Sequence, residues 1–382
     1  MYISDAVKYI GVDDKTIDLF ESQYPVPNGV SYNSYVIMDD KVAIMDTADP
    51  RATEQWVSNL KEALGNRIPD YLVVSHMEPD HSGSIRTILE MYPDITVVGN
   101  AKTFPMMAQF LDTTIIRNQL VVKEGDTLEL GTHTLTFVMA PMVHWPEVMV
   151  EYESTEKILF SADGFGKFGA LDTDEPWIDE ARRYYLNIVG KYGASVQGLL
   201  KKAAALDIEM ICPLHGPVLT ENLGYYIDLY DKWSSYKPEQ EGVLIACASI
   251  HGNTKTAAKL LQEKLEAAGV KTMFMDLTRD SMSEAVARAF YFDRIVCCAC
   301  TYDGGLFPPM EDYINHLKAK AYQSRKVAFV ENGTWAPQAA KNMRVAFEAM
   351  KNIEIVEPVV TIKSTLNTDS EKAMDELVNA LK

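Results

Sequence analysis

Short apolar runs interrupted by polar residues characterise the first 230 residues. They occupy residues 31–39, 41–48, 71–76, 95–100, 133–141, 148–154 and 157–163. Runs of this length predict β-strands, and each one leads into a polar or charged residue. Amphipathic segments such as residues 51–64 predict helices between some of the strands. This pattern favours stacked sheets with helices outside.

The rhythm changes in the last third of the chain. Continuous apolar runs occupy residues 242–249, 271–277, 294–302, 326–333 and 354–362, and helical patterns such as 253–269 separate them. Apolar strands that alternate with amphipathic helices predict a doubly wound parallel sheet. A polar stretch with a proline, residues 231–242, lies between the two patterns. The chain has 382 residues, which is more than a single hydrophobic core usually holds. We therefore predict two domains, residues 1–240 and 241–382.

Composition narrows the classes of protein that fit. A formal charge of −18 argues against nucleic acid and anionic membranes as partners. No apolar run reaches the roughly 18 residues of a membrane span. The N-terminal segment lacks the basic and apolar regions of a secretory signal. Five cysteines, three of them within residues 297–300, do not form a disulfide framework and suit a reducing cytoplasm, where we expect the protein to be located.

Histidines and carboxylates gather where predicted strands end. Of only seven histidines, two lie in "SHMEPDHSG" at residues 75–83, directly after a buried strand. Three later strands lead in the same way to His144, Asp163 and His215. Functional residues of α/β proteins collect at the carboxyl ends of strands, so these side chains are predicted to form one site. The ligand types that we single out are His76, Glu78, Asp80, His81, His144, Asp163 and His215.

The second domain carries a separate signal. In "ASIHGNTKTAAKLL" a strand leads into a helix through Ser249, His251, Gly252, Asn253 and Thr254, whose hydroxyl and N–H groups would bind a phosphate at the helix N-terminus. No Gly-Lys-Ser/Thr follows, which disfavours a nucleotide triphosphatase. Two later strand ends provide aromatic residues and glycines for a planar ring: Thr301, Tyr302, Asp303, Gly304 and Gly305, then Asn332, Gly333, Thr334 and Trp335.

The motifs of each half resemble a known fold. The order H-x-[HE]-x-D-H, then His, Asp and His, is similar to that of the metallo-β-lactamase fold, an αββα sandwich with a binuclear site. The hydrolytic members, commonly zinc enzymes, have a second histidine where this chain has Glu78. Mixed imidazole and carboxylate ligands suit non-haem iron. The loop at residues 249–254 resembles the flavodoxin phosphate loop, which implies FMN.

A metallo-β-lactamase-like domain followed by a flavodoxin-like domain resembles the flavodiiron proteins along nearly the whole chain. The resemblance implies that one iron is held by His76, Glu78 and His144, a second by Asp80, His81 and His215, and that Asp163 bridges them. Members reduce dioxygen to water, nitric oxide to nitrous oxide, or both. Two ferrous ions and one reduced FMN hold the four electrons that dioxygen requires. The family also implies a homodimer in which the flavin of one subunit faces the irons of its partner, with a tetramer left open.

Several positions depart from the family pattern or have roles that the resemblance alone implies. Asn28 stands where a histidine is frequent, and Cys300 stands where we expected proline. Tyr184 or Tyr185 is expected to point a hydroxyl into the gas pocket. Glu147, three residues after His144, is a candidate for orienting an imidazole.

The pair Cys297 and Cys300 has no second C-x-x-C with which to form a rubredoxin iron site. We therefore expect a separate electron donor, such as rubredoxin or a reduced deazaflavin. Two alternatives remain open: a zinc hydrolase of the metallo-β-lactamase superfamily with an accessory flavodoxin domain, and a pure electron-transfer flavoprotein. Iron, zinc and FMN content would separate the three.

Overall fold

The computed structural model describes residues 2–382, and the chain forms two compact units. Unit 1 comprises the residues up to Tyr185 together with Tyr192–Asp231. Unit 2 comprises Leu186–Lys191 and Lys232–Lys382. The predicted division at residue 240 lies at the first residue of strand β16 (Gln240–Ala248).

Unit 1 contains two main sheets. The first has six strands in the order β1-β6-β7-β8-β9-β10, which are Val7–Tyr9, Tyr35–Met38, Val42–Met45, Tyr71–Val73, Thr96–Asn100 and Asn118–Val122. The second has the order β11-β12-β13-β14-β15, which are Thr127–Glu129, Thr134–Met139, Met149–Glu153, Ile158–Phe160 and Met210–Cys212. Two small pairs add β2 (Val12–Asp14) with β5 (Val30–Tyr32) and β3 (Leu19–Phe20) with β4 (Tyr24–Pro25).

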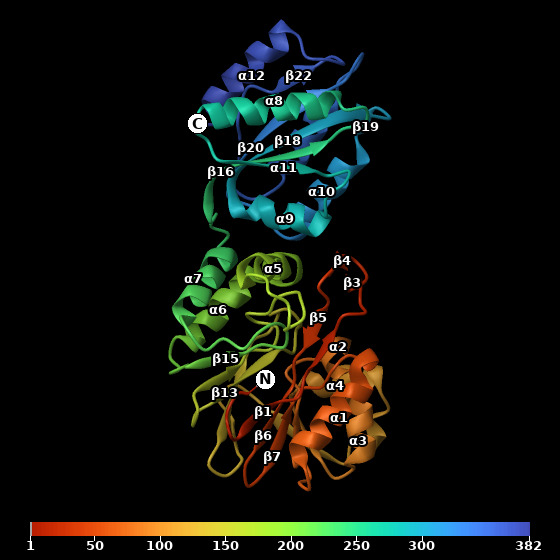
Figure 1. Cartoon of the computed structure of the whole chain (residues 1–382), viewed down its shortest axis with the longest axis vertical. Helices are drawn as coiled ribbons and strands as arrows, with labels where there is room; N and C mark the ends of the chain where they lie inside the picture. Colours follow the sequence, from red (N-terminus) through yellow and green to blue (C-terminus); the bar gives the residue numbers. More distant parts are fainter. Residues whose placement is uncertain (1) are drawn as a thin grey trace. The chain divides into compact units, whose positions relative to one another are not determined.

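The two sheets pack face to face around one apolar core. Tyr35 and Val98 of the first sheet and Phe137 and Phe160 of the second belong to the same buried cluster. Figure 1 shows helices on both outer sides of this sandwich. The helices of unit 1 are α1 (Thr53–Leu64), α2 (Pro79–Ser82), α3 (Ile85–Met91), α4 (Thr103–Phe110), α5 (Trp177–Tyr184), α6 (Gly193–Ala203) and α7 (Leu223–Ser234), whose last residues belong to unit 2. The αββα sandwich predicted from the sequence is confirmed.

Unit 2 is a doubly wound sheet, as predicted. Its parallel strands have the order β17-β16-β18-β20-β21, and β22 also pairs with β20. Their bounds are Thr272–Asp276, Gln240–Ala248, Phe292–Tyr302, Arg325–Asn332, Ile353–Ile355 and Val360–Ile362, and β19 (Gly305–Leu306) pairs antiparallel with β18. The helices are α8 (Asn253–Ala267), α9 (Met282–Tyr291), α10 (Pro308–Ala319), α11 (Ala339–Glu348) and α12 (Thr368–Ala380). Figure 1 shows α8 and α12 on one face and α9, α10 and α11 on the other.

The run at residues 31–39, predicted as one strand, is divided between β5 and β6. Asn33 interrupts it because its side-chain amide donates to the carbonyls of Pro213 and Gly216, at 2.8 and 2.7 Å. The neighbouring Ser34 hydroxyl donates to the carbonyl of Asp46, at 3.0 Å. The break therefore ties the chain to the loop that carries His215.

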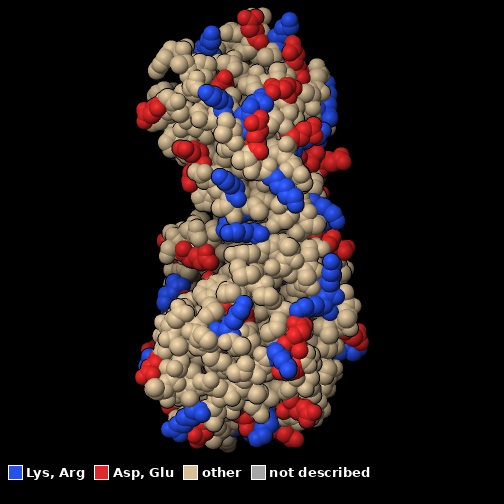
Figure 2. All heavy atoms as spheres, turned by 180° about the vertical axis from the view of Figure 1, so that it is seen from behind, with Lys and Arg blue, Asp and Glu red and all other residues tan. Residues whose placement is uncertain are grey.

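Charge is distributed unequally along the chain. Residues 232–382 hold equal numbers of basic and acidic side chains, so the whole formal charge of −18 belongs to residues 1–231. On the face of unit 2 in Figure 2, acidic and basic side chains are interspersed. The strongly acidic unit 1 generates a potential that attracts cations. Within residues 2–382, every helix is too short or too polar to cross a lipid bilayer.

Candidate metal centre and cofactor pocket

Four loops at strand ends deliver the predicted metal-ligating side chains in unit 1. The loop after β8 carries His76 and Glu78 and continues into α2 with Asp80 and His81. The loops after β12, β14 and β15 carry His144, Asp163 and His215, respectively. The structure brings all seven side chains together in two adjoining groups, within each of which the potential ligand atoms lie no more than 4.8 Å apart: His76, Glu78, His144 and Asp163, then Asp80, His81 and His215.

The first group centres on two imidazole nitrogens. The Nε2 atom of His144 lies 2.9 Å from Glu78 Oε2 and 3.0 Å from Asp163 Oδ2. The Nε2 atom of His76 lies 3.2 Å from the same Asp163 oxygen. Four side chains thus direct nitrogen and oxygen atoms at one small volume.

The second group has the same character. The Nε2 atoms of His81 and His215 lie 2.9 Å apart, and Asp80 Oδ2 is 3.3 and 3.2 Å from them. The other oxygen of Asp163, Oδ1, is 3.7 Å from each of these two nitrogens. The two oxygens of Asp163 therefore face different groups.

The carboxylates of the two groups favour positive charge on the side chains around them. Burial opposes ionisation of Asp163, but the charge of His76 and the hydrogen bond with His144 hold its pKa well below the usual range. Burial likewise disfavours a charged His144, yet hydrogen bonds with Asp163 and Glu78 raise its pKa to about 10. These carboxylates thus hold positive charge between them. Metal cations would supply that charge while leaving the imidazoles neutral, as ligation requires.

Buried polar atoms without hydrogen-bond partners also indicate that metal ions fit this cluster. Both oxygens of Asp80, Nε2 of His76 and Oδ1 of Asp163 are buried without a hydrogen-bond partner among the described residues. Buried polar atoms of this kind are rare unless an ion or water binds them. His215 is oriented for ligation, because its Nδ1 lies 2.7 Å from the Ser31 carbonyl and must be the protonated nitrogen, which leaves Nε2 free to bind a metal. The donor set of imidazoles and carboxylates fits two non-haem irons.

The other sequence-predicted residues of unit 1 take different places. Tyr184 is fully buried with its ring 5.4 Å from that of His215, whereas the Tyr185 ring packs 5.0 Å from Tyr230. Glu147, expected beside an imidazole, instead accepts a hydrogen bond from the Met77 backbone N–H, at 2.8 Å. It therefore fixes the backbone between His76 and Glu78.

Asn28 belongs to a network in the loops of unit 1. Its amide donates to Glu175 Oε2 at 2.8 Å, and Glu175 Oε1 pairs with the buried Lys167 at 2.8 Å. Lys167 also packs against Gly216, which follows the ligand-type residue His215. Asn28 thus helps to hold the loop that begins at Asp163.

The β3–β4 hairpin was not predicted from the sequence. Phe20 lies with its ring 5.4 Å from His215. At the tip, Glu21 and Ser22 have φ of 47° and 56°, which L-residues seldom adopt. Glu21 is exposed as a residue, yet desolvation of its carboxyl and the charge of Glu78 raise its pKa to about 7. No motif marks this hairpin, and only the tertiary fold brings it to the cluster.

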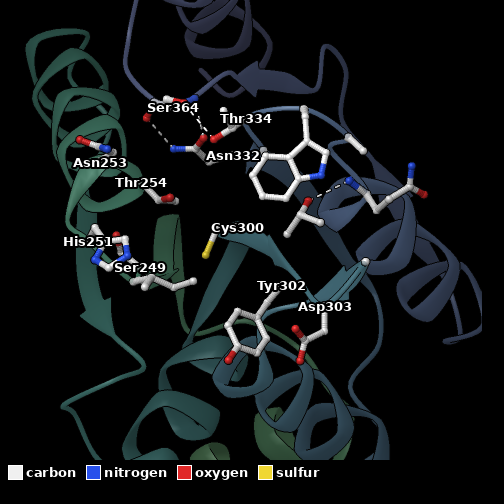
Figure 3. A pocket seen from close by; sticks show the side chains of 17 residues that line it. Ser249, His251, Asn253, Thr254, Cys300, Tyr302, Asp303, Asn332, Thr334 and Ser364 are labelled. Atoms are coloured by element: carbon white, nitrogen blue, oxygen red, sulfur yellow. Dashed lines mark hydrogen bonds between the residues drawn. The ribbon is translucent and has the colours of Figure 1, made fainter.

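Unit 2 contains a cavity of about 570 Å³ at the carboxyl ends of its strands. All the predicted cofactor-binding residues line it except Gly252 and Gly305. Gly252 caps the N-terminus of α8 with a φ of 92°. Gly305, in β19, pairs with Tyr302 of β18. In Figure 3, Asn253 and Thr254 lie on one side of the cavity and Tyr302 on another, with the Cys300 sulfur between them.

Hydrogen bonds fix the far wall of this cavity. Asn332 donates to the Ser364 carbonyl and accepts from the Ser364 N–H, at 2.9 and 3.0 Å, and Thr334 and Ser364 join their hydroxyls at 2.9 Å (Figure 3). The Thr301 hydroxyl accepts from the backbone of Gln338, at 2.8 Å. Ser364 and Gln338 also line the cavity and were not predicted. A polar helix terminus facing apolar and aromatic walls suits a phosphate joined to a planar ring.

Comparisons with known proteins agree with these features. The model of the ODP family beta lactamase matches residues 30–216. The chain is 28% identical to a nitric oxide reductase of Moorella thermoacetica, across 94% of this chain and 92% of the relative. It is 32% identical to a diflavin flavoprotein of Synechocystis, across 68% of this chain, and spans about half of that relative's length, 47%. The rubredoxin oxygen:oxidoreductase of Desulfovibrio gigas shares the fold, with a TM-score of 0.93, 23% identity and coverage of 100% and 97% of the two chains.

Proposed function

The chain belongs to the flavodiiron protein family and is an oxidoreductase, and we propose that it reduces dioxygen to water, nitric oxide to nitrous oxide, or both. The reaction would take place at a diiron centre in unit 1 and draw on electrons from FMN in unit 2. The relatives include a protein named nitric oxide reductase and one named rubredoxin oxygen:oxidoreductase, so both gases are substrates to test.

The arrangement of Asp163 carries this proposal. One of its oxygens, Oδ2, lies 3.0 Å from Nε2 of His144 in the first ligand group. The other oxygen, Oδ1, lies 3.7 Å from Nε2 of His81 in the second group. A carboxylate in that position would bridge two metal ions. His76, Glu78 and His144 would hold one ion, and Asp80, His81 and His215 would hold the other.

When bound, the two irons would bind and polarise the gas while FMN passes electrons to them. The protein's own side chains would shape the site around that chemistry. Burial, and then the charges of Asp163 and Glu78, raise the pKa of Tyr184 well above its usual value, so its hydroxyl keeps its proton and is able to donate. Phe20 and Tyr184 pack beside His215 and would keep bulk water from that side.

We further propose a separate electron donor, such as rubredoxin or a reduced deazaflavin, and a homodimer as the working unit. The name of the Desulfovibrio gigas relative includes rubredoxin, which makes rubredoxin the first donor to test.

The experiment that tests the function combines content and turnover. Purified protein should contain two irons and one FMN per chain, and the fully reduced protein should consume dioxygen, nitric oxide or both under anaerobic mixing. Side-by-side measurement of the two gases would establish the preference. Zinc without gas consumption would instead support the hydrolase, and FMN without metal would support an electron carrier.

The phosphate loop gives a second prediction. Asn253→Ala combined with Thr254→Ala should remove two hydrogen bonds to the FMN phosphate, each worth about 1.5–3 kcal/mol for a charged acceptor. Flavin affinity should then fall on the order of 10²–10⁴-fold. The variant should lose its yellow colour on dialysis and keep its iron.

Gln262→Ala is the matched control, because Gln262 lies on the same helix but bonds to Glu266, away from the cavity. It should retain flavin. A double variant that binds FMN as tightly as wild type would mean that the phosphate binds elsewhere.

A further inference from the structure

Two buried acidic residues, Asp46 and Glu151, share the hydroxyl of Ser75, the residue before His76. Asp46 follows β7, Ser75 precedes His76 in the loop after β8, and Glu151 belongs to β13 of the opposite sheet. The exposed fractions are 2% for Asp46, 1% for Ser75 and 0% for Glu151. Burial of two ionised carboxylates is costly unless both are paired or fully hydrogen-bonded, which favours a proton on one of them.

The Ser75 hydroxyl lies within hydrogen-bonding distance of both carboxyl groups. The Ser75 oxygen lies 2.6 Å from Asp46 Oδ2 and 3.1 Å from Glu151 Oε2. A hydroxyl has a single hydrogen to donate, so the Ser75 oxygen cannot serve two ionised carboxylates, and we assign its hydrogen to the carboxylate that is otherwise better satisfied, Asp46. The contact with Glu151 would then join two acceptor oxygens unless Glu151 itself carries the hydrogen. Asp46 also accepts from the Ser75 backbone N–H at 2.8 Å, so it is the better-satisfied carboxylate.

The surroundings of Glu151 favour the neutral form. Its neighbours across the sheet are Phe137 and Phe160, and its Oε1 atom has no hydrogen-bond partner among the described residues. The titratable groups whose charges act on it are Asp46, which raises its pKa, and His76, which lowers it. Burial first, and then the charge of Asp46, raise the pKa of Glu151 well above its usual value.

We propose that Glu151 is a protonated carboxylic acid in the folded protein and that it positions the metal-ligating loop by donating its hydrogen to Ser75. The chain of donation runs from Glu151 to Ser75 to Asp46. The Ser75 carbonyl also accepts from the Met149 N–H at 3.0 Å, so every polar group of Ser75 is held immediately before His76. Glu151 is thus a positioning residue, and its effect on metal rests on the proposed ligand role of His76.

Infrared spectroscopy tests the protonation directly. The spectrum of wild type minus that of Glu151→Gln should contain the C=O stretching band of a carboxylic acid, which shifts in deuterated water. Glu153→Gln is the matched control, because Glu153 is equally buried on the same strand but accepts from the N–H groups of Thr155 and Glu156, both at 2.7 Å. The spectrum of wild type minus that of Glu153→Gln should contain the bands of an ionised carboxylate. A carboxylate band for Glu151 as well would overturn the proposal.

Iron release tests the positioning role. Glu151→Gln supplies an amide N–H in place of the acid hydrogen and should lose iron to a chelator at the wild-type rate. Glu151→Leu has no donor and should lose iron about tenfold faster, as variants of outer-shell partners do. Equal rates in all three proteins would refute the positioning role. The infrared result does not depend on gas reduction, so it distinguishes failure of this inference from failure of the proposed function.

Discussion

Asparagine in place of Asp163 should remove metal from both ligand groups and lower gas reduction by more than about 100-fold. Changing an outer-shell partner of a metal ligand already costs 10–100-fold, so loss of a carboxylate that we propose to be shared by two ions should exceed that range. Asparagine keeps the size of the side chain but removes its negative charge. The cluster favours that charge, because it holds the pKa of Asp163 well below the usual range. The four imidazoles of the cluster would then have Glu78 and Asp80 as their remaining carboxylate partners within the two groups.

Iron content by elemental analysis and gas consumption of the reduced protein measure this effect. Asp172→Asn is the control, since Asp172 is exposed and pairs with the exposed Lys15. It should keep its iron and its activity. An Asp163→Asn protein with two irons per chain would show that this carboxylate is no bridge.

The sequence predicted that the seven candidate ligands come together, because each of them follows a recognisable strand. A run such as 71–76 has a clear apolar pattern, and a sheet brings the carboxyl ends of parallel strands to one edge. The αββα layers and the doubly wound sheet followed from the same runs and from the motifs they carry. Local pattern therefore sufficed wherever the structure continues what the nearby residues favour.

Prediction failed where a tertiary contact overrides the local pattern. Asn33 divides an otherwise continuous strand because its amide binds carbonyls at residues 213 and 216, far along the sequence. Glu151 is a polar residue in a strand position that faces the core, where the alternating pattern expects an apolar side chain. Ser364 enters the cofactor cavity through its bonds to Asn332. None of these contacts leaves a signal in a single sequence.

Mixing two inactive proteins should restore about a quarter of wild-type activity, because we propose that electrons cross between the subunits of a homodimer. One partner is Asp163→Asn, which should lack metal, and the other is Asn253→Ala with Thr254→Ala, which should lack FMN. The cluster and the cavity belong to different units of the chain, so each variant leaves the other unit intact. Each parent alone should be inactive.

The expected value follows from the two-fold symmetry of the proposed dimer. Random exchange makes about half of the dimers mixed, and each mixed dimer would hold one intact flavin–iron pair out of two, which gives the quarter. If electrons instead passed within one chain, every chain in the mixture would lack one cofactor and activity would stay at zero. Exchange must be verified by native mass spectrometry of subunits carrying different tags. Verified mixed dimers without recovered activity would therefore place the whole electron path within a single chain and disprove transfer between subunits.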